Sequence, residues 1–383
     1  MNLNKVFDIN SIFRPSRTEF KRFSPKMNKS AFSKKIIEWY KENKRDLPWR
    51  DTKDPYPIWL SEIILQQTRV AQGLPYFKRF IENFSSIHKL AAAKEQDVLR
   101  LWQGLGYYTR ARNLHRCAKV IVKDYHGNFP DNFIDLQKLP GIGAYTAAAI
   151  ASFAFLEPVA VVDGNVFRVL SRVFGMEHDI ASVEGKDLFS KKANELISQE
   201  NPDLFNQAIM EFGATHCLPK NPKCEECIFK KSCVALAREW QDRLPIKEKK
   251  IKIHKRYFYY LVIEQNKKVM MRKREGKDIW KGLYDFPLIE TKRPQKIELI
   301  VGQADVLSKL KQKFEFHSSS TTYRHVLSHQ ILLAKFIFIT LKAKHSKNID
   351  LKKDSMRFYS SAAMHKLPKP ILVNRFLLES GIL

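Results

Sequence analysis

Residues 139–147 read LPGIGAYTA, and this stretch decides how the rest of the chain is interpreted. Pro140, Gly141 and Gly143 end one helix and permit a tight turn, and the alanine-rich run that follows favours a second helix over 144–155. The pattern predicts a helix-hairpin-helix. Unpaired backbone N–H groups at the start of the second helix attract an anion, so this turn can bind a nucleic-acid phosphate without reading the base sequence.

The chain is strongly basic. Its 383 residues carry 67 Lys and Arg against 40 Asp and Glu, a formal net charge of +27, which points to a polyanionic partner. No apolar run is long enough to span a bilayer, and the N-terminus lacks a signal-peptide core. We therefore expect no membrane partner and a cytoplasmic, DNA-associated monomer.

The composition divides the chain into successive segments. We expect a disordered basic arm over 1–28, a mainly α domain over 29–243, a lysine-rich linker over 244–256 and a small α+β domain over 257–383. In the last segment, strands are predicted at 257–263 and 269–271, with a turn at Gln265-Asn266, and at 323–333 and 336–341. A helix is predicted near 360–366.

A carboxyl group lies inside an otherwise apolar helix that Pro57 is well placed to open. Glu62 is in the middle of this helix, and Gln66 and Arg69 follow at i+4 and i+7 on the same face. Two interpretations stay open. Glu62 is neutralised by Arg69 or another buried base, or burial raises its pKa so that it holds a proton near neutral pH and releases it to a substrate.

A second carboxyl group, Asp163, stands between the apolar run 158–162 and a predicted helix over 166–174. It is either the N-cap of that helix or a carboxylate placed for chemistry. Arg50 also has two interpretations, as a phosphate ligand or as the partner of Asp51. Tyr107, on a glycine-rich turn, either packs within its loop or wedges between stacked bases.

Four of the five cysteines follow the spacing Cys217-x6-Cys224-x2-Cys227-x5-Cys233. Because the chain is expected to be intracellular, metal thiolates are favoured over disulfides. Zinc commonly uses two C-x-x-C pairs, and only one is present, so the spacing fits zinc poorly. An iron–sulfur cluster also takes four thiolates. Cys117 is isolated on a helix and is predicted to be a buried apolar residue.

At this point the sequence resembles a known family. The resemblance to helix-hairpin-helix DNA glycosylases with an iron–sulfur cluster rests on the hairpin at 139–145, the segment 161–165 and the cysteine spacing. Within that group, WLSE at 59–62 and LQQTRV at 65–70 resemble adenine DNA glycosylases of the MutY type. The match covers roughly 32–233. It implies a glycosylase domain whose loop 217–233 binds a [4Fe-4S] cluster through the four cysteines.

The resemblance also implies a substrate and a mechanism. The substrate would be double-stranded DNA in which adenine is mispaired with 8-oxoguanine or guanine, and the adenine would be flipped out and its N-glycosidic bond cut. Glu62 would protonate N7 of the adenine, and Asp163 would stay ionised and stabilise the sugar cation. Tyr145 and Asn165 match positions that support the sugar and the carboxylates.

Other roles carry over by position. Gln67 and Tyr107 match residues that enter the duplex around the mispair, and Arg50 matches a polar residue near the catalytic pocket. Endonuclease III-type glycosylase/lyases carry a lysine where Tyr145 stands, and that lysine forms a Schiff base. We therefore expect a monofunctional glycosylase. A bifunctional glycosylase/lyase and a non-enzymatic helix-hairpin-helix DNA-binding protein remain as alternatives.

The C-terminal segment resembles the Nudix-like domain of the same glycosylases through WKGLYDFP at 280–287. The glutamate-rich metal helix of active Nudix hydrolases is absent, so we expect recognition rather than pyrophosphatase activity. Residues 326–329 resemble the loop that checks the oxidised guanine, with Leu327 in place of the usual phenylalanine. In that loop Ser328 and His329 could still form hydrogen bonds with the base.

Overall fold

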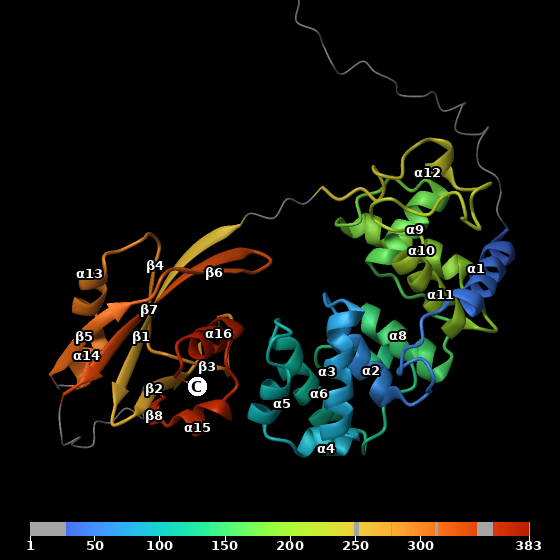
Figure 1. Ribbon diagram of the computed structural model, residues 1–383. Helices are drawn as coiled ribbons and strands as arrows, with labels where there is room; N and C mark the ends of the chain where they lie inside the picture. Colours follow the sequence, from blue (N-terminus) through green and yellow to red (C-terminus); the bar gives the residue numbers. More distant parts are fainter. Residues whose placement is uncertain (1–27, 249–252, 277, 311–312, 343–354, 383) are drawn as a thin grey trace, which may run out of the picture. The chain divides into compact units, whose positions relative to one another are not determined.

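The structure is a computed structural model that describes residues 28–248, 253–276, 278–310, 313–342 and 355–382 (Figure 1). The described residues form two compact units. The first contains residues up to 59, 130–138 and 142–248, and the second contains 60–129, 139–141 and the residues from 253 onward. The predicted basic arm lies outside the described residues except for Asn28, whose side chain caps the first helix through Ser30 N. Within the described ranges no helix is long and apolar enough to cross a membrane.

The first unit is helical. Its helices are α1 (Lys29–Asn43), the first part of α2 (Pro55–Leu65), α7 (Phe133–Leu136), α8 (Ala144–Phe155), α9 (Gly164–Phe174), α10 (Val183–Leu196), α11 (Pro202–Thr215) and α12 (Val234–Ala237). A buried apolar core joins α1, α9, α10 and α11. Phe229, from the cysteine loop, belongs to this core and stacks on Phe32 of α1 with ring centroids 4.7 Å apart. The core therefore fixes the cysteine loop against the helices.

The hairpin around residues 139–147 forms as predicted, although its first helix is only the short α7. Helix α8 has the predicted bounds and ends at Leu156, which adopts a left-handed conformation. Gly141 has φ +80°, and a Cβ there would come within 2.6 Å of the Asn113 side chain, so glycine is needed. Gly143 is the N-cap of α8, and a Cβ there would meet nothing within 4 Å, so the helix start is open.

The predicted helix around Glu62 is shorter than expected. Helix α2 ends at Leu65, because Gln67 takes a left-handed φ of 54° that stops the helix. Arg69 is the N-cap residue of the next helix. Gln66 and Arg69 therefore do not continue a polar stripe on α2, and that part of the prediction is wrong.

The second unit has a helical part and a sheet. The helices are the rest of α2, α3 (Val70–Asn83), α4 (Ile87–Ala92), α5 (Glu95–Leu101) and α6 (Thr109–Asp124), followed later in the chain by α13 (Ile297–Gly302), α14 (Asp305–Leu310), α15 (Ser361–His365) and α16 (Ile371–Glu379). The strands are β1 (His254–Gln265), β2 (Lys268–Lys273), β3 (Tyr284–Asp285), β4 (Leu288–Thr291), β5 (Phe314–Ser319), β6 (Tyr323–Val326), β7 (Gln330–Leu341) and β8 (Met356–Tyr359).

The sheet has the order β3-β2-β1-β7-β5, with β1 and β7 parallel and β4, β6 and β8 paired outside this path. Side chains alternate between its faces. Leu261 of β1 and Ile337 of β7 pack on α13 and α14, whereas Phe336 stacks on Phe376 of α16 with centroids 3.7 Å apart. Figure 1 shows α13 and α14 on one side of the sheet and α16 on the other. The predicted mainly α and α+β classes are confirmed.

Two predicted details of the sheet are wrong. The β1–β2 turn is made by Asn266 and Lys267, both left-handed, one residue later than expected, because that pair gives the turn its required positive φ values. The predicted strand over 323–333 is interrupted at 327–329, where the chain reverses between β6 and the antiparallel β7. The predicted helix near 360–366 is confirmed as α15.

A buried ion cluster joins the segment before α2 to α11. Glu211 Oε1 accepts hydrogen bonds from Arg45 N at 3.2 Å and Arg45 Nε at 2.6 Å, and Oε2 accepts one from Arg50 Nη2 at 2.6 Å. The Glu211 side chain has no exposed surface. Burial alone would raise its pKa, but the hydrogen bonds and charges of Arg45 and Arg50 outweigh burial and lower the pKa to about 2. The folded chain therefore holds Glu211 ionised.

We predict that Glu211→Gln lowers the free energy of unfolding at pH 7 by about 3–5 kcal/mol, because it leaves buried guanidinium charge uncompensated. The folded pKa lies below the usual value of 4.5, so the stabilising effect is present above that pH and is lost as the pH falls toward about 2. Urea unfolding at several pH values measures both effects. Glu195→Gln is the control, because Glu195 pairs only with surface Lys192. A difference from wild type that stays constant between pH 7 and 3 would contradict the assignment.

Candidate active site

Asp163 is fixed by the start of α9. Its Oδ1 accepts hydrogen bonds from the backbone N–H groups of Asn165 and Val166, both at 2.8 Å, and its Oδ2 accepts one from Asn165 Nδ2 at 2.8 Å. Asp163 is thus an N-cap, as one of the two interpretations predicted. Burial raises its pKa, while these three donors and the charge of Arg168 act in the opposite direction by favouring the carboxylate.

A chain of hydrogen bonds continues from Asp163 to the cysteine loop. Asn165 Oδ1 accepts from Arg168 Nη2 at 2.8 Å, and Arg168 also donates to the carbonyls of Cys217 at 2.8 Å and Gly213 at 2.7 Å. One turn later, Arg172 Nη1 donates to the carbonyl of Leu218 at 2.7 Å. The orientation of the carboxylate therefore depends on the same arginine that holds the first residue of the cysteine loop.

The sequence did not lead us to Arg168. The signal was present, because Arg168 and Arg172 are spaced i, i+4 in a helix whose other buried residues are apolar apart from Ser171, and both arginines are buried. Two arginines with this spacing in a buried helix indicate that hydrogen-bond acceptors from other segments of the chain contact their guanidinium groups. Sequence alone does not name those groups, because they lie more than forty residues away.

The four cysteines of the loop 217–233 come close enough to affect one another's charge. The pKa of Cys227 is raised to about 12, first by burial and then by the other three thiols, Cys233, Cys217 and Cys224. Backbone and side-chain N–H groups also point at sulfur, with Phe229 N 3.4 Å from Cys227 Sγ and Arg172 Nη1 3.5 Å from Cys217 Sγ.

Within the described ranges, no three His, Cys, Asp or Glu side chains are close enough to bind one metal ion. Ligands of a single zinc ion would have to converge on one point. The ligands of an iron–sulfur cluster each bind a separate iron and stand further apart. Four thiols within range of one another's charge, with N–H groups directed at two of them, match the donor set of such a cluster.

Other predicted residues of the first unit are placed as follows. Tyr145 is in the first turn of α8, half-buried, with its hydroxyl 3.7 Å from Met210 Sδ. The guanidinium of Arg50 is engaged by Glu211, and only 11% of its side chain is exposed. Arg50 is therefore committed to the ion cluster, and its pairing with Asp51 is replaced by pairing with Glu211. Glu211 is a functional candidate that the sequence did not reveal, because Arg45 and Arg50 lie about 160 residues away.

Glu62 belongs to the second unit. It is buried in α2, with 8% of the residue exposed. Burial disfavours the charged form of a carboxyl group unless a hydrogen bond or an opposite charge compensates it. Because Asp163 lies in the first unit, the expected meeting of the two carboxyl groups stays a prediction.

Three of the predicted DNA-contacting residues come together in the second unit. Tyr107, Ser328 and His329 line a cavity of about 360 Å³ together with Trp280 and Leu327. The Tyr107 hydroxyl and Ser328 Oγ are hydrogen-bonded to each other. Tyr107 is 45% exposed, and its backbone is left-handed with φ 48°. Aromatic faces and hydroxyl groups around one cavity suit a planar, polar ligand such as a nucleobase.

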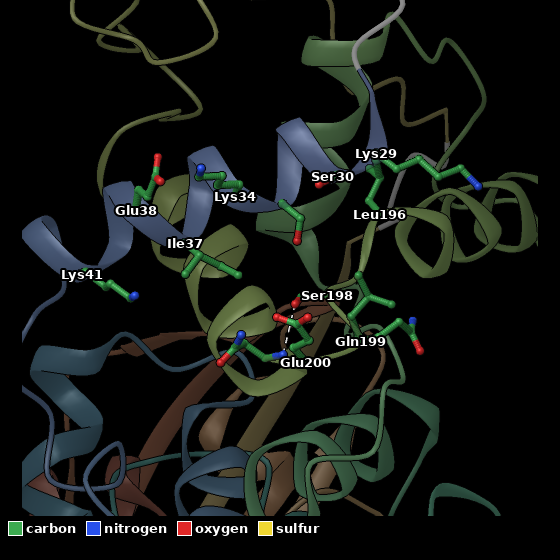
Figure 2. A pocket seen from close by; sticks show the side chains of 13 residues that line it. Lys29, Ser30, Lys34, Ile37, Glu38, Lys41, Leu196, Ser198, Gln199 and Glu200 are labelled. Atoms are coloured by element: carbon green, nitrogen blue, oxygen red, sulfur yellow. Dashed lines mark hydrogen bonds between the residues drawn. The ribbon is translucent and has the colours of Figure 1, made fainter.

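A second cavity, of about 570 Å³, lies in the first unit between α1 and the segment that joins α10 to α11 (Figure 2). Lys29, Lys34 and Lys41 line it together with Glu38 and Glu200. None of the residues that the sequence singled out lines this cavity, so it is separate from the candidate site.

Comparisons with known proteins show which families this chain resembles. Residues 60–199 match the model of the HhH-GPD superfamily base excision DNA repair proteins, and residues 258–379 match the NUDIX domain. A solved thermostable thymine-DNA glycosylase is 31% identical with a TM-score of 0.51, covering 54% of this chain and 95% of its own.

Adenine DNA glycosylases are among the similar proteins. The human protein is 39% identical over 242 residues, which are 61% of this chain and 44% of the human one. The protein of Buchnera aphidicola subsp. Schizaphis graminum is 37% identical over 348 residues, which are 89% of this chain and 96% of the relative. Because this last match spans nearly the full length of both proteins, the chain belongs to the adenine DNA glycosylase family.

Proposed function

We propose that this protein removes adenine from double-stranded DNA where it is mispaired with 8-oxoguanine or guanine, by hydrolysing the N-glycosidic bond. The observation that carries the proposal is the capped carboxylate of Asp163, which accepts three hydrogen bonds at 2.8 Å. Three hydrogen bonds restrict rotation of the carboxylate, so its negative charge is held in a fixed position where it can stabilise a positive charge. The names of the relatives and the match to a base excision repair family support the substrate.

The two carboxyl groups divide the chemistry. Glu62, which is buried in α2, holds a proton and donates it to N7 of the flipped adenine, so that the base takes the electrons of the breaking C1′–N9 bond and leaves as neutral adenine. Asp163 stays ionised and stabilises the positive charge that develops on the sugar. Asn165 and the two backbone N–H groups orient Asp163, and Arg168 orients Asn165 in turn. Water then adds at C1′ and leaves an abasic site.

The reaction stops at base removal. A lyase needs an amine that forms a Schiff base with the opened sugar, and the hairpin helix carries Tyr145 at the position where endonuclease III-type lyases have a lysine. A phenol cannot form that bond. We propose that the protein acts as a monomer.

We propose that Cys217, Cys224, Cys227 and Cys233 hold a [4Fe-4S] cluster. The support is the mutual influence of their charges, the N–H groups directed at sulfur and the sequence spacing of the four cysteines. When bound, the cluster would supply structural cross-linking of the loop. The lysines of the loop, Lys220, Lys223, Lys230 and Lys231, could then bind phosphates of the duplex backbone.

We propose that the cavity lined by Tyr107, Ser328 and His329 receives the base opposite the adenine. Leu327 stands where the family has phenylalanine, but Trp280 and Tyr107 supply aromatic surface in the same cavity. Aromatic surface stacks on any base, whereas the hydroxyl of Ser328 and the ring of His329 can distinguish an oxidised guanine by hydrogen bonding.

Single-turnover cleavage tests the function, with duplexes that carry adenine opposite 8-oxoguanine, guanine or thymine and with alkali added to reveal abasic sites. We expect release from the first two duplexes and a rate lower by about 100-fold or more in Glu62→Gln and Asp163→Asn. Glu82→Gln and Asp187→Asn are matched controls at exposed positions and should keep the wild-type rate.

The outcomes separate the alternatives. Absence of adenine release from the first two duplexes would contradict the proposal. Strand breaks without alkali, together with a borohydride-trapped adduct, would indicate a bifunctional lyase. A chain that releases no base, yet binds DNA equally well with and without both carboxyl substitutions, would instead be a non-enzymatic DNA-binding protein.

For the cluster, we predict that the purified protein contains iron and acid-labile sulfide in equal amounts and that Cys224→Ser loses most of both. Cys117→Ala removes a buried thiol from α6, outside the loop, and should leave the iron content unchanged. Elemental analysis and visible absorption give the readout. Zinc in place of iron, or iron retained in Cys224→Ser, would contradict the prediction.

A further inference from the structure

Arg110 lies in the first turn of α6 and reaches across to the end of α2. Its Nη1 donates to three carbonyl oxygens, those of Ile63 and Ile64 at 2.9 Å and of Gln66 at 2.6 Å. The last carbonyls of a helix have no partner within the helix, and a cation placed there also meets the negative end of the helix dipole. Arg110 therefore stabilises the end of α2, immediately before Gln67.

The same guanidinium also faces a second loop. Its Nη2 lies 3.3 Å from the carbonyl oxygen of Gly106 and 3.4 Å from that of Leu105. Its charge lies over the rings of Trp102, at 5.0 Å from the centroid, and Tyr107, at 5.7 Å. The backbone N–H of Arg110 donates to the carbonyl of Tyr107 at 2.9 Å. One side chain thus contacts the loop before Gln67 and the loop that carries Tyr107.

Both loops hold a residue in an unfavourable backbone conformation. Gln67 has φ 54° and Tyr107 has φ 48°. Both values lie in the left-handed region, which residues other than glycine, asparagine and aspartate seldom adopt. Such a conformation persists only where surrounding contacts impose it. Arg110 supplies those contacts on both sides, because its hydrogen bonds end on the residues next to Gln67 and Tyr107.

Burying the charged side chain of Arg110 between these two loops costs free energy. Burial lowers its pKa to about 10, so that it is still charged at pH 7, and within the described ranges no carboxylate forms an ion pair with it. Its Nε has no hydrogen-bond partner among the described residues. An apolar side chain would fill the space without burying a charge. The fork of the guanidinium, which can bind two sets of carbonyls at once, is what an apolar side chain or a lysine lacks.

We infer that Arg110 is a positioning residue that sets Gln67 and Tyr107 at a fixed separation, so that the two side chains enter the duplex together. The inference rests on the proposed function and on the expectation, implied by the family resemblance, that these two residues enter the duplex around the mispair. It adds a residue that binds neither DNA nor adenine but determines whether the mispair can be opened.

Base unstacking and base release are measured separately to test the inference. A duplex carries 2-aminopurine next to the mispaired adenine, and its fluorescence rise on protein binding reports unstacking. Arg110→Met is expected to lose most of that rise and to lower the single-turnover rate by about 100-fold, the scale of a small misplacement. Its affinity for an undamaged duplex should stay unchanged, since phosphate contacts dominate that affinity. Arg110→Lys keeps the charge but not the forked guanidinium, and its single-turnover rate is expected to lie between the rates of the wild type and Arg110→Met.

Two controls keep the outcome specific. Arg116→Met removes the same charge from an exposed position on the same helix and should behave as wild type. In a chain that already carries Gln67→Ala and Tyr107→Ala, Arg110→Met should have little further effect on the rate, because the residues that it positions are gone.

Several results would overturn the inference. One is a wild-type rate and fluorescence rise in Arg110→Met, and another is an equal loss of rate with and without Gln67 and Tyr107, which indicates a general effect on folding. Thermal unfolding shows whether Arg110→Met is folded. If it is not, the loss of rate with and without Gln67 and Tyr107 is compared in Arg110→Lys, and that comparison tests the inference. A wild-type protein that releases no adenine contradicts the proposed function instead, while the fluorescence comparison still tests Arg110.

Discussion

Charge buried away from water is the constraint on which this structure depends, because each buried ion must find compensating groups or be neutralised. The chain satisfies it in three ways. Glu211 is compensated by two arginines, Asp163 by N–H groups at a helix start, and Arg168 by carbonyl oxygens. The contacts of Glu211 and Arg168 hold segments together that are distant in the sequence, whereas Asp163 is held by the start of its own helix.

Backbone groups are the commonest partners of the buried arginines. Arg168, Arg172 and Arg110 all donate chiefly to carbonyl oxygens, in the cysteine loop or at the end of α2. A carbonyl cannot be removed by mutation or change its protonation, so these contacts are insensitive to pH. Glu211 differs, because its compensation is lost when it is protonated. The contacts of these three arginines with carbonyl oxygens are therefore independent of pH, whereas the contacts of Glu211 respond to acid.

Local patterns let the sequence predict much of the first unit. The bounds of α8 followed from Pro140, the glycines and the alanine run, and the cap at Asp163 followed from its place between an apolar run and a helix. The end of α2 could not be predicted, since it depends on Arg110, more than forty residues further along the chain. Glu211 was missed for the same reason. In the sheet, runs of β-branched and aromatic residues predicted strands, but the reversal at 327–329 carries no glycine or proline to mark it.

The central claim is that Glu62 supplies a proton to N7 of the adenine while Asp163 stays charged. Replacing the mispaired adenine by 7-deazaadenine, which has a C–H group in place of N7, tests it most directly, because it removes the atom that receives the proton and leaves the shape of the base. The account predicts that the protein binds this duplex opposite 8-oxoguanine but releases no base in single-turnover conditions. Release of 7-deazaadenine at a rate near that of adenine would contradict the account.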